Sequence, residues 1–329
     1  MATILVVAEI RDGVPTGLTR EVLGLARELA GEGVAALAFT PHPEPLADLI
    51  AHGAGRVYWC DQSEAYDGEL WVAVTEQVAQ EIAPHAILAC HTSAGAELAP
   101  RVAFRVQSAV ATGCTGITSE SGKLLFTRGC YGGNVRETMS FATIPAIATV
   151  KAGVGVPNAS AVRTGDIVRV TAPALIRRTR IVARQRESAD TQALENAKII
   201  VAGGRGLEGP EGFRVLEALA QSLGAAVGSS RVPCDLGWCP HSWQIGLTGK
   251  TVTPDLYFAI GISGAGQHMA GCGNAKTIVA INTDADAAIF REARYGIVGD
   301  YRKVVPALVE AVKALDSAPG ALPYQPDRT

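Results

Sequence analysis

The sequence predicts an α/β protein of two domains, each a mostly parallel sheet flanked by helices. Short apolar, β-branched runs alternate with stretches of helical spacing, which is the pattern of parallel α/β sheets. The pattern begins again near Lys198, after a stretch of different character. A chain of 329 residues is also long enough to bury two separate cores.

In the first half, one helix is expected at Leu18–Ala30, because Leu18, Val22, Leu25 and Leu29 recur at helical spacing and Gly31 follows as a stop. It lies between the first two of the expected strands, which are Thr3–Glu9, Val34–Phe39, Val57–Trp59 and Ala86–Ala89.

The middle stretch, Lys123–Arg186, has strand-like runs but few helical signals. We expect antiparallel strands here that complete the first domain, with a turn at Gly132–Asn134. The polar segment Ser188–Asn196 is the expected linker, so that the domains are residues 1–190 and 191–329. The strand-like runs are Leu124–Thr127, Ile144–Val150, Ile167–Thr171 and Arg180–Ala183.

In the second half, a helix is expected from about Phe213 to Leu223, since Gly224 follows it as a stop. It lies between the first two of five expected strands. These are Lys198–Ala202, Ala225–Gly228, Leu256–Ile262, Thr277–Asn282 and Gly296–Val298.

The composition narrows the class of protein. Apolar residues make up 48% of the chain and charged residues 19%, as in a well-packed globular protein. A net charge of −3 offers no basic field, so we expect neither nucleic acid nor membrane as a partner. The first residues lack a basic region like that of a signal peptide, and the seven scattered cysteines read as reduced thiols. These features predict a cytoplasmic protein.

Two turns rich in small residues are candidates for anion binding. The run Leu256–His268 takes an expected strand into Gly261-Ile262-Ser263-Gly264-Ala265-Gly266, where a helix can begin. Small residues let a ligand approach the backbone, and amides at the start of a helix favour an anion such as a pyrophosphate. A tight turn without a ligand explains this run equally well. The second turn is Gly203–Gly206, where the Arg205 guanidinium could neutralise the charge of a phosphate. A single arginine on a loop is more commonly just solvated.

Two other patterns are weaker. Gly246–Thr251 imitates a phosphate-binding P-loop, but Gln244 occupies the position that requires glycine. Cys234, Cys239 and His241 have poor spacing for a metal site, so buried or loop thiols are the favoured interpretation.

In combination, the C-terminal motifs resemble the α subunit of electron-transfer flavoproteins over Lys198–Lys313. The N-terminal domain is a weaker match, mainly through Ile4–Glu9 and the helix after it. The motifs are GGRG at Gly203–Gly206, the elements around Ser230, Arg231 and Asp235, Q-x-G-x-TGK at Gln244–Lys250, the long run at Leu256–His268, AIN at Ala280–Asn282, and YGIVGD at Tyr295–Asp300.

The resemblance implies a heterodimer. The C-terminal domain would be a Rossmann-like fold carrying one non-covalent FAD. The N-terminal domain would contact a β subunit, which holds AMP in the simple carriers and a second FAD in the bifurcating ones. Electrons would pass from dehydrogenases, typically acyl-CoA dehydrogenases of fatty acid β-oxidation, to a quinone oxidoreductase or another acceptor. The alternative from another class is an α subunit of an NADH-oxidising, electron-bifurcating complex.

The resemblance also implies roles for individual residues around FAD. Arg205 would lie near the phosphates or the ring, Ser230 would bond the cofactor, and Arg231 would lie over the isoalloxazine. His268 would reach the C2 oxygen, where a donor stabilises the negative charge gained on reduction. The remaining predicted contacts are Gln244, Ile245, Gly246, Leu247 and Thr248 along the flavin, Ser263, Gly264, Ala265, Gly266 and Gln267 at the pyrophosphate and ribityl chain, and Asn282 and Asp300 towards adenosine.

The sequence departs from the family pattern at four positions near these motifs. Leu247 replaces the commoner Gln, and Gly266 stands where a branched aliphatic residue is usual. Phe258 and Ala288 are the other two departures. None of them removes a backbone donor, so we expect FAD binding to survive, with a flavin potential that Leu247 can alter.

Overall fold

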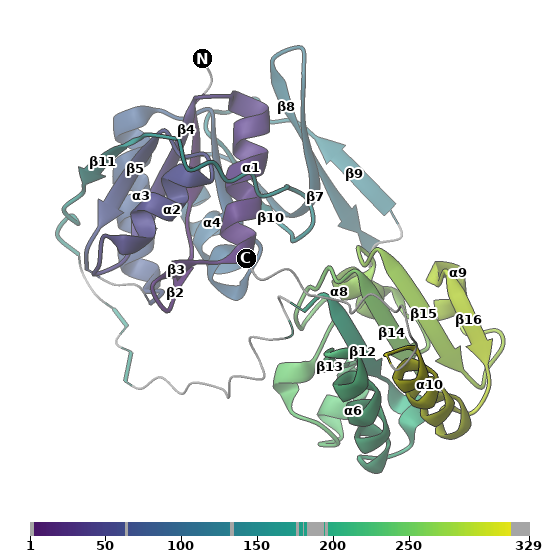
Figure 1. Cartoon of the computed structure of the whole chain (residues 1–329). Helices are drawn as coiled ribbons and strands as arrows, with labels where there is room; N and C mark the ends of the chain where they lie inside the picture. The colour runs from purple at the N-terminus through teal and green to yellow at the C-terminus, as the bar shows by residue number, and fades with distance from the viewer. Residues whose placement is uncertain are drawn as a thin grey trace. The chain divides into compact units, whose positions relative to one another are not determined.

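A computed structural model describes residues 3–62, 65–131, 135–175, 178–179, 181–182, 194 and 197–316. The chain divides into two compact units, Met1–Arg184 and Gln185–Thr329. Each has its own sheet, which confirms the predicted α/β class with mostly parallel sheets flanked by helices (Figure 1). The predicted boundary at residue 190 lies outside the described residues, as does the predicted turn at Gly132–Asn134.

The first unit is built on a nine-stranded sheet in the order β11-β5-β4-β1-β6-β10-β7-β8-β9, beside a small β2–β3 hairpin. All neighbours from β11 to β7 are parallel. The strands are β1 (Ile4–Val7), β2 (Ile10–Arg11), β3 (Val14–Pro15), β4 (Val34–Phe39), β5 (Arg56–Cys60), β6 (Ala86–Cys90), β7 (Val110–Glu120), β8 (Lys123–Cys130), β9 (Val135–Met139), β10 (Ala146–Val150) and β11 (Asp166–Arg169). The helices are α1 (Gly17–Ala30), α2 (Glu44–Ala51), α3 (Gly68–Ile82) and α4 (Ser93–Arg105).

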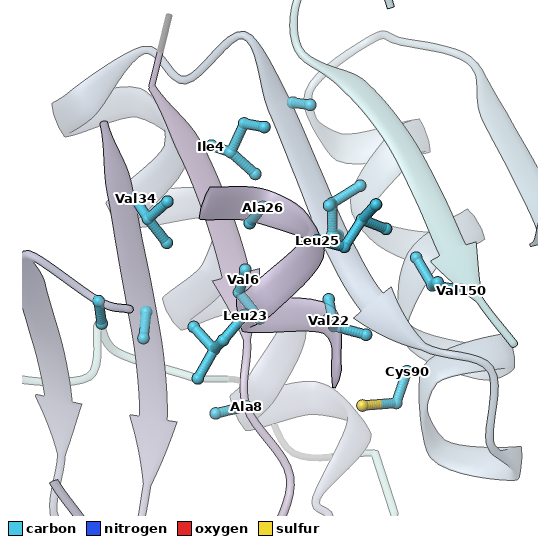
Figure 2. Packing of buried hydrophobic residues seen from close by; sticks show 14 of the residues in the cluster. Ile4, Val6, Ala8, Val22, Leu23, Leu25, Ala26, Val34, Cys90 and Val150 are labelled. Atoms are coloured by element: carbon cyan, nitrogen blue, oxygen red, sulfur yellow. The ribbon is translucent and has the colours of Figure 1, made fainter. Parts of the chain in front are cut away.

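Both faces of this sheet are covered. Ile4 and Val6 of β1 pack with Val22 and Leu23 of α1 on one face (Figure 2). Leu5 lies in a second cluster on the other face, which α3 and α4 cover. A strand buried on both sides reads as a continuous apolar run, which explains why the sequence revealed β1 and β4 so clearly.

The prediction of antiparallel strands in the middle stretch was partly wrong. β8 is antiparallel to β7 and β9 as expected. However, β10 enters the sheet between β6 and β7 and is parallel to both, and β11 is parallel to β5 at the far edge. All five residues of β10 are buried, which is typical of an internal parallel strand.

Two further expectations at the end of the first domain also need correction. Ile181 and Val182 do not form a strand, while Arg180 and Ala183 lie outside the described residues. Leu194, within the expected polar linker, is buried in the core of the second unit. A single apolar residue in a polar segment can therefore belong to a core.

The second unit is a five-stranded sheet in the order β13-β12-β14-β15-β16, with every pair parallel. This is a doubly wound order with helices on both faces. The strands are β12 (Ile199–Gly203), β13 (Ala226–Ser229), β14 (Leu256–Ile260), β15 (Thr277–Asn282) and β16 (Tyr295–Val298). The helices are α6 (Glu211–Leu223), α7 (Arg231–Asp235), α8 (Gly266–Cys272), α9 (Ile289–Glu292) and α10 (Tyr301–Asp316), with short 3₁₀ turns η2 (Arg205–Leu207) and η3 (His241–Trp243).

The two faces of the second sheet carry different helices. α6 and α10 lie side by side on one face (Figure 1). There Phe213, Leu216 and Val305 pack with Phe258 of the sheet. On the other face, Cys272 of α8 and Ile289 of α9 pack with Tyr257, the neighbour of Phe258 in β14. Among the described helices, none combines the length and apolarity that crossing a bilayer requires.

Candidate functional site at the carboxyl edge of the second sheet

The predicted cofactor contacts gather at one edge of the second sheet. Since all five strands are parallel, their carboxyl ends meet at the same edge. Arg205 follows β12, Ser230 and Arg231 follow β13, and Ser263–His268 follow β14. Asn282 ends β15, and Asp300 lies just beyond β16. β12 and β14 are neighbours whose following helices cover opposite faces, which makes this the switch point where ligands bind in open α/β sheets.

Two glycine turns touch at this switch point. A Cβ atom on Gly204 would lie 2.2 Å from the carbonyl oxygen of Gly261, so the turns after β12 and β14 can meet only without side chains. The Gly206 amide donates to the same oxygen at 3.0 Å. Gly261 also has φ of +62°, a conformation that favours glycine. The contact fixes Arg205 beside the loop that begins at Ile262.

The loop after β14 presents unused backbone donors. The amides of Ser263–Gln267 donate to no acceptor within the described ranges, whereas the Ser263 carbonyl accepts from the Ile289 amide at 3.0 Å. Ser263, Ala265 and Gln267 are exposed. Successive amides without an acceptor among the described residues, beside the start of α8, suit a polyanionic group.

The segment Gln244–Thr248 is attached to both β13 and α8 by its backbone. The Ile245 amide donates to Ser229 at 2.8 Å, and the Leu247 amide donates to Gln267 at 2.7 Å. Gly246 has φ of +145° and donates to Lys250, which closes the turn. These bonds hold the segment next to Ser263–Gln267.

Two side chains of this segment pair with each other. Gln244 is buried and its Nε2 donates to Thr248 Oγ1 at 2.9 Å. Thr248 and Leu247 are exposed at the edge. The Thr248 hydroxyl proton remains available to an external acceptor, because its oxygen is the atom that accepts from Gln244.

Two arginines lie at this edge of the sheet. The side chains of Arg205 and Arg231 are exposed, and Arg231 Nε donates to Asp235 Oδ2 at 3.0 Å. The Ser230 amide donates to the Gly203 carbonyl at 2.9 Å, which ties the start of α7 to β12. Arginine side chains therefore lie just beyond the carboxyl ends of β12 and of the edge strand β13.

His268 is held inside the protein. Its Nδ1–H donates to the Ile245 carbonyl at 3.0 Å, so Nε2 carries the lone pair that accepts from the Tyr257 hydroxyl at 3.0 Å. Burial lowers the pKa of His268 to about 4. The imidazole is thus neutral and joins α8, β14 and the segment Gln244–Thr248. The predicted contact with the C2 oxygen of a flavin would require it to release the Ile245 carbonyl.

The two residues assigned to adenosine have structural bonds of their own. Asn282 Nδ2 donates to Ile262 at 2.9 Å, and its Oδ1 accepts from the Asp284 amide at 3.0 Å. Asp300 Oδ1 accepts from the Arg302 amide at 2.9 Å and so caps α10. The two are connected, because the Gly299 amide donates to the Asn282 carbonyl at 2.9 Å.

Tyr257 was not among the residues predicted for this site. Its side chain is fully buried, and its hydroxyl is the partner of His268. A tyrosine in a buried strand needs a hydrogen-bond partner for its hydroxyl, and this requirement could have identified Tyr257 from the sequence.

Comparison with known proteins agrees with this architecture. Residues 4–175 match the electron transfer flavoprotein domain, and residues 193–273 match the electron transfer flavoprotein FAD-binding domain. The electron transfer flavoprotein subunit alpha of Thermoanaerobacterium thermosaccharolyticum is 42% identical over 324 residues, covering 95% of this chain and 98% of that protein. The subunit alpha of Bacillus subtilis is 39% identical, with 95% and 98% covered.

The chain belongs to the electron transfer flavoprotein α-subunit family. A third relative, Protein FixB of Clostridium saccharobutylicum, is 37% identical over 96% of this chain and 97% of its own length.

The carboxyl edge of the second sheet carries donors of the kind that a dinucleotide needs. A dinucleotide brings a pyrophosphate, which the free amides of Ser263–Gln267 and the guanidinium of Arg205 are suited to bind. At Gly204 and Gly261 the two turns meet backbone to backbone, with no room for a Cβ atom between them. The family match to the FAD-binding domain includes these residues, whereas Asn282 and Asp300 lie beyond it.

The glycine contact can be tested with Gly204→Ala. The new methyl group would collide with backbone, so we expect FAD affinity to fall at least about tenfold, which corresponds to roughly 1.4 kcal/mol. Gly209→Ala is the matched control, since no atom lies within 4 Å of a Cβ at that position. Fluorescence titration with FAD measures both. Equal affinities for the two variants would contradict the proposed role of the contact.

His268 predicts a pH dependence of stability. The unfolded chain takes up a proton at the ordinary pKa of 6.5, but the folded chain does so only near 4. The free energy of unfolding therefore falls as the pH drops from 6.5 towards 4, by up to roughly 3 kcal/mol. Above pH 6.5 the stabilisation by the neutral imidazole is fully present. His268→Gln should flatten urea-unfolding stability across this window, whereas His241→Gln, at an exposed histidine, should not. An unchanged slope in His268→Gln would refute the assignment.

Proposed function

We propose that this chain is the FAD-carrying subunit of a heterodimeric electron-transfer flavoprotein. It would receive electrons from dehydrogenases, such as acyl-CoA dehydrogenases, and deliver them to a quinone oxidoreductase or another acceptor. The observation that carries the proposal is the loop Ser263–Gln267, whose amides have no described acceptor and which lies at the switch point within a matched FAD-binding domain.

The protein's contribution would be to bind and orient the cofactor and to set the charge around it. Bound FAD supplies the electron transfer itself. Ser263–Gln267 and Arg205 would hold the pyrophosphate, and Ser230 would bond the cofactor. Gln244–Thr248 would lie along the flavin ring, with the Thr248 hydroxyl available as a donor. Asn282 and Asp300 would lie towards the adenosine end.

Arg231 would tune the flavin electrostatically. A cation near the ring stabilises the negative charge that reduction adds, and the effect is stronger in a partly dry site. Asp235 accepts from Arg231 at 3.0 Å and offsets part of this charge. His268 would act differently, because its low pKa makes it a neutral group that positions the Ile245 carbonyl.

The second half of the heterodimer would be a β subunit holding AMP or a second FAD. Co-purification of the two subunits tests this directly, with FAD and AMP counted per heterodimer and NADH tested as a reductant. One FAD with AMP supports the simple carrier that we propose. Two FADs with reduction by NADH would replace it with an electron-bifurcating complex, and a heterodimer without FAD would refute the proposed function.

The ion pair between Arg231 and Asp235 in α7 allows two substitutions with opposite expected effects on the flavin reduction potential. Arg231→Ala should lower the flavin reduction potential by an amount on the order of tens of millivolts. Asp235→Asn should raise it, because the guanidinium loses its counter-charge. Arg214→Ala is the control, since that exposed arginine lies on α6 and pairs with Glu211 at 3.1 Å. Redox titration of the flavin absorbance gives the values, and an unchanged potential in Arg231→Ala would contradict the assigned role.

A further inference from the structure

Two thiols lie close together beside the candidate site and have no part in the proposed function. Cys234 belongs to α7, and Cys239 follows it after a short turn. Their sulfur atoms are 3.5 Å apart. Both are buried, with exposed fractions of 2% for Cys234 and 9% for Cys239. The sequence predicted buried or loop thiols here, but not that they would meet.

The local backbone creates this proximity. α7 ends at Asp235, and Gly237 then adopts φ of +71°, which reverses the chain. Amides of the turn donate back to α7, from Gly237 to Cys234 and from Trp238 to Pro233, each at 2.9 Å. Cys239 therefore returns over the helix that carries Cys234.

We propose that Cys234 and Cys239 are a reversible modification site, at which a low-molecular-weight disulfide such as oxidised glutathione converts the two thiols into an intramolecular disulfide. The sulfur atoms must approach from 3.5 Å to a bonding distance of about 2.05 Å. Both sulfur atoms belong to one short stretch of chain, from α7 with five residues to η3 with three.

The chemistry is thiol–disulfide exchange. The Cys239 thiolate attacks one sulfur of oxidised glutathione, forms a mixed disulfide and releases one glutathione thiolate. That thiolate takes the proton of Cys234, whose sulfur then attacks the Cys239 sulfur and expels the second glutathione. Two protein thiols are oxidised, and one molecule of oxidised glutathione is reduced to two of glutathione.

The environment favours Cys239 as the first nucleophile. It is the more exposed of the two, and Gly237 and Pro240 beside it are exposed as well. The hydrogen bond from the Cys234 thiol lowers the pKa of Cys239, and the same contact raises the pKa of Cys234. A thiolate is the attacking form in exchange.

The disulfide would lie within residues 231–244, whose two ends belong to the candidate site. α7 begins with Arg231, and η3 leads directly into Gln244. The disulfide would link α7, which begins at Arg231, to the turn that leads through η3 into Gln244. This consequence for cofactor binding rests on the proposed function, whereas the formation of the bond does not.

Peptide mapping of the native protein tests the site without any substitution. The native protein is incubated with oxidised glutathione, free thiols are alkylated, and the peptides are identified by mass spectrometry. We expect a Cys234–Cys239 disulfide that dithiothreitol reverses. Recovery of both residues as alkylated thiols, or of a lasting glutathione adduct on either, would overturn the proposal.

Intrinsic fluorescence gives a second readout that does not depend on FAD. Trp238 lies between the two cysteines and Trp243 lies in η3, so oxidation should change tryptophan emission. Cys234→Ser should abolish this change, and Cys130→Ser, at a cysteine in the first unit, should keep it. The same change in Cys234→Ser would contradict the disulfide as its cause. Loss of FAD binding with an intact oxidation response would instead count only against the proposed function.

Discussion

The contact between Gly204 and Gly261 is the constraint on which the candidate site depends. It brings the turns after β12 and β14 closer than any side chain permits, and the Gly206 amide bonds across it. From this contact the chain enters Ser263–Gln267 with its amides unused by the described residues. The parallel sheet supplies the edge, and the glycines allow the two turns to meet there backbone to backbone.

A site built largely from backbone tolerates changes of side chain. Leu247 is exposed, and its amide donates to Gln267 whatever side chain it carries. Gly266 begins α8 without a positive φ, so the backbone conformation at this position does not require glycine. The residue adds only backbone freedom. Both departures from the family pattern therefore leave the arrangement of donors intact and alter only the surroundings. Phe258 lies in the core beneath α6 and α10, away from the edge.

The sequence predicted the strands of the second sheet well, because short apolar runs alternate there with turn residues and helical stretches; Thr277–Asn282 has the predicted bounds. Pairing was harder to predict. β10 and β11 join strands far away in the chain, and nothing local specifies a parallel neighbour. The positions of the site residues at one edge follow from strand direction, but the internal bonds of His268 and the meeting of Cys234 with Cys239 depend on tertiary packing, which spacing does not encode.

Backbone recognition at Ser263–Gln267 is the central claim, and amide hydrogen exchange measures it most directly. Exchange is followed in the full chain with its β subunit, once with FAD bound and once after FAD has been removed. The amides of Ser263–Gln267 should exchange more slowly with FAD bound, because they then donate to the pyrophosphate. Equal exchange at these amides in the two states, with FAD demonstrably bound, would contradict the account.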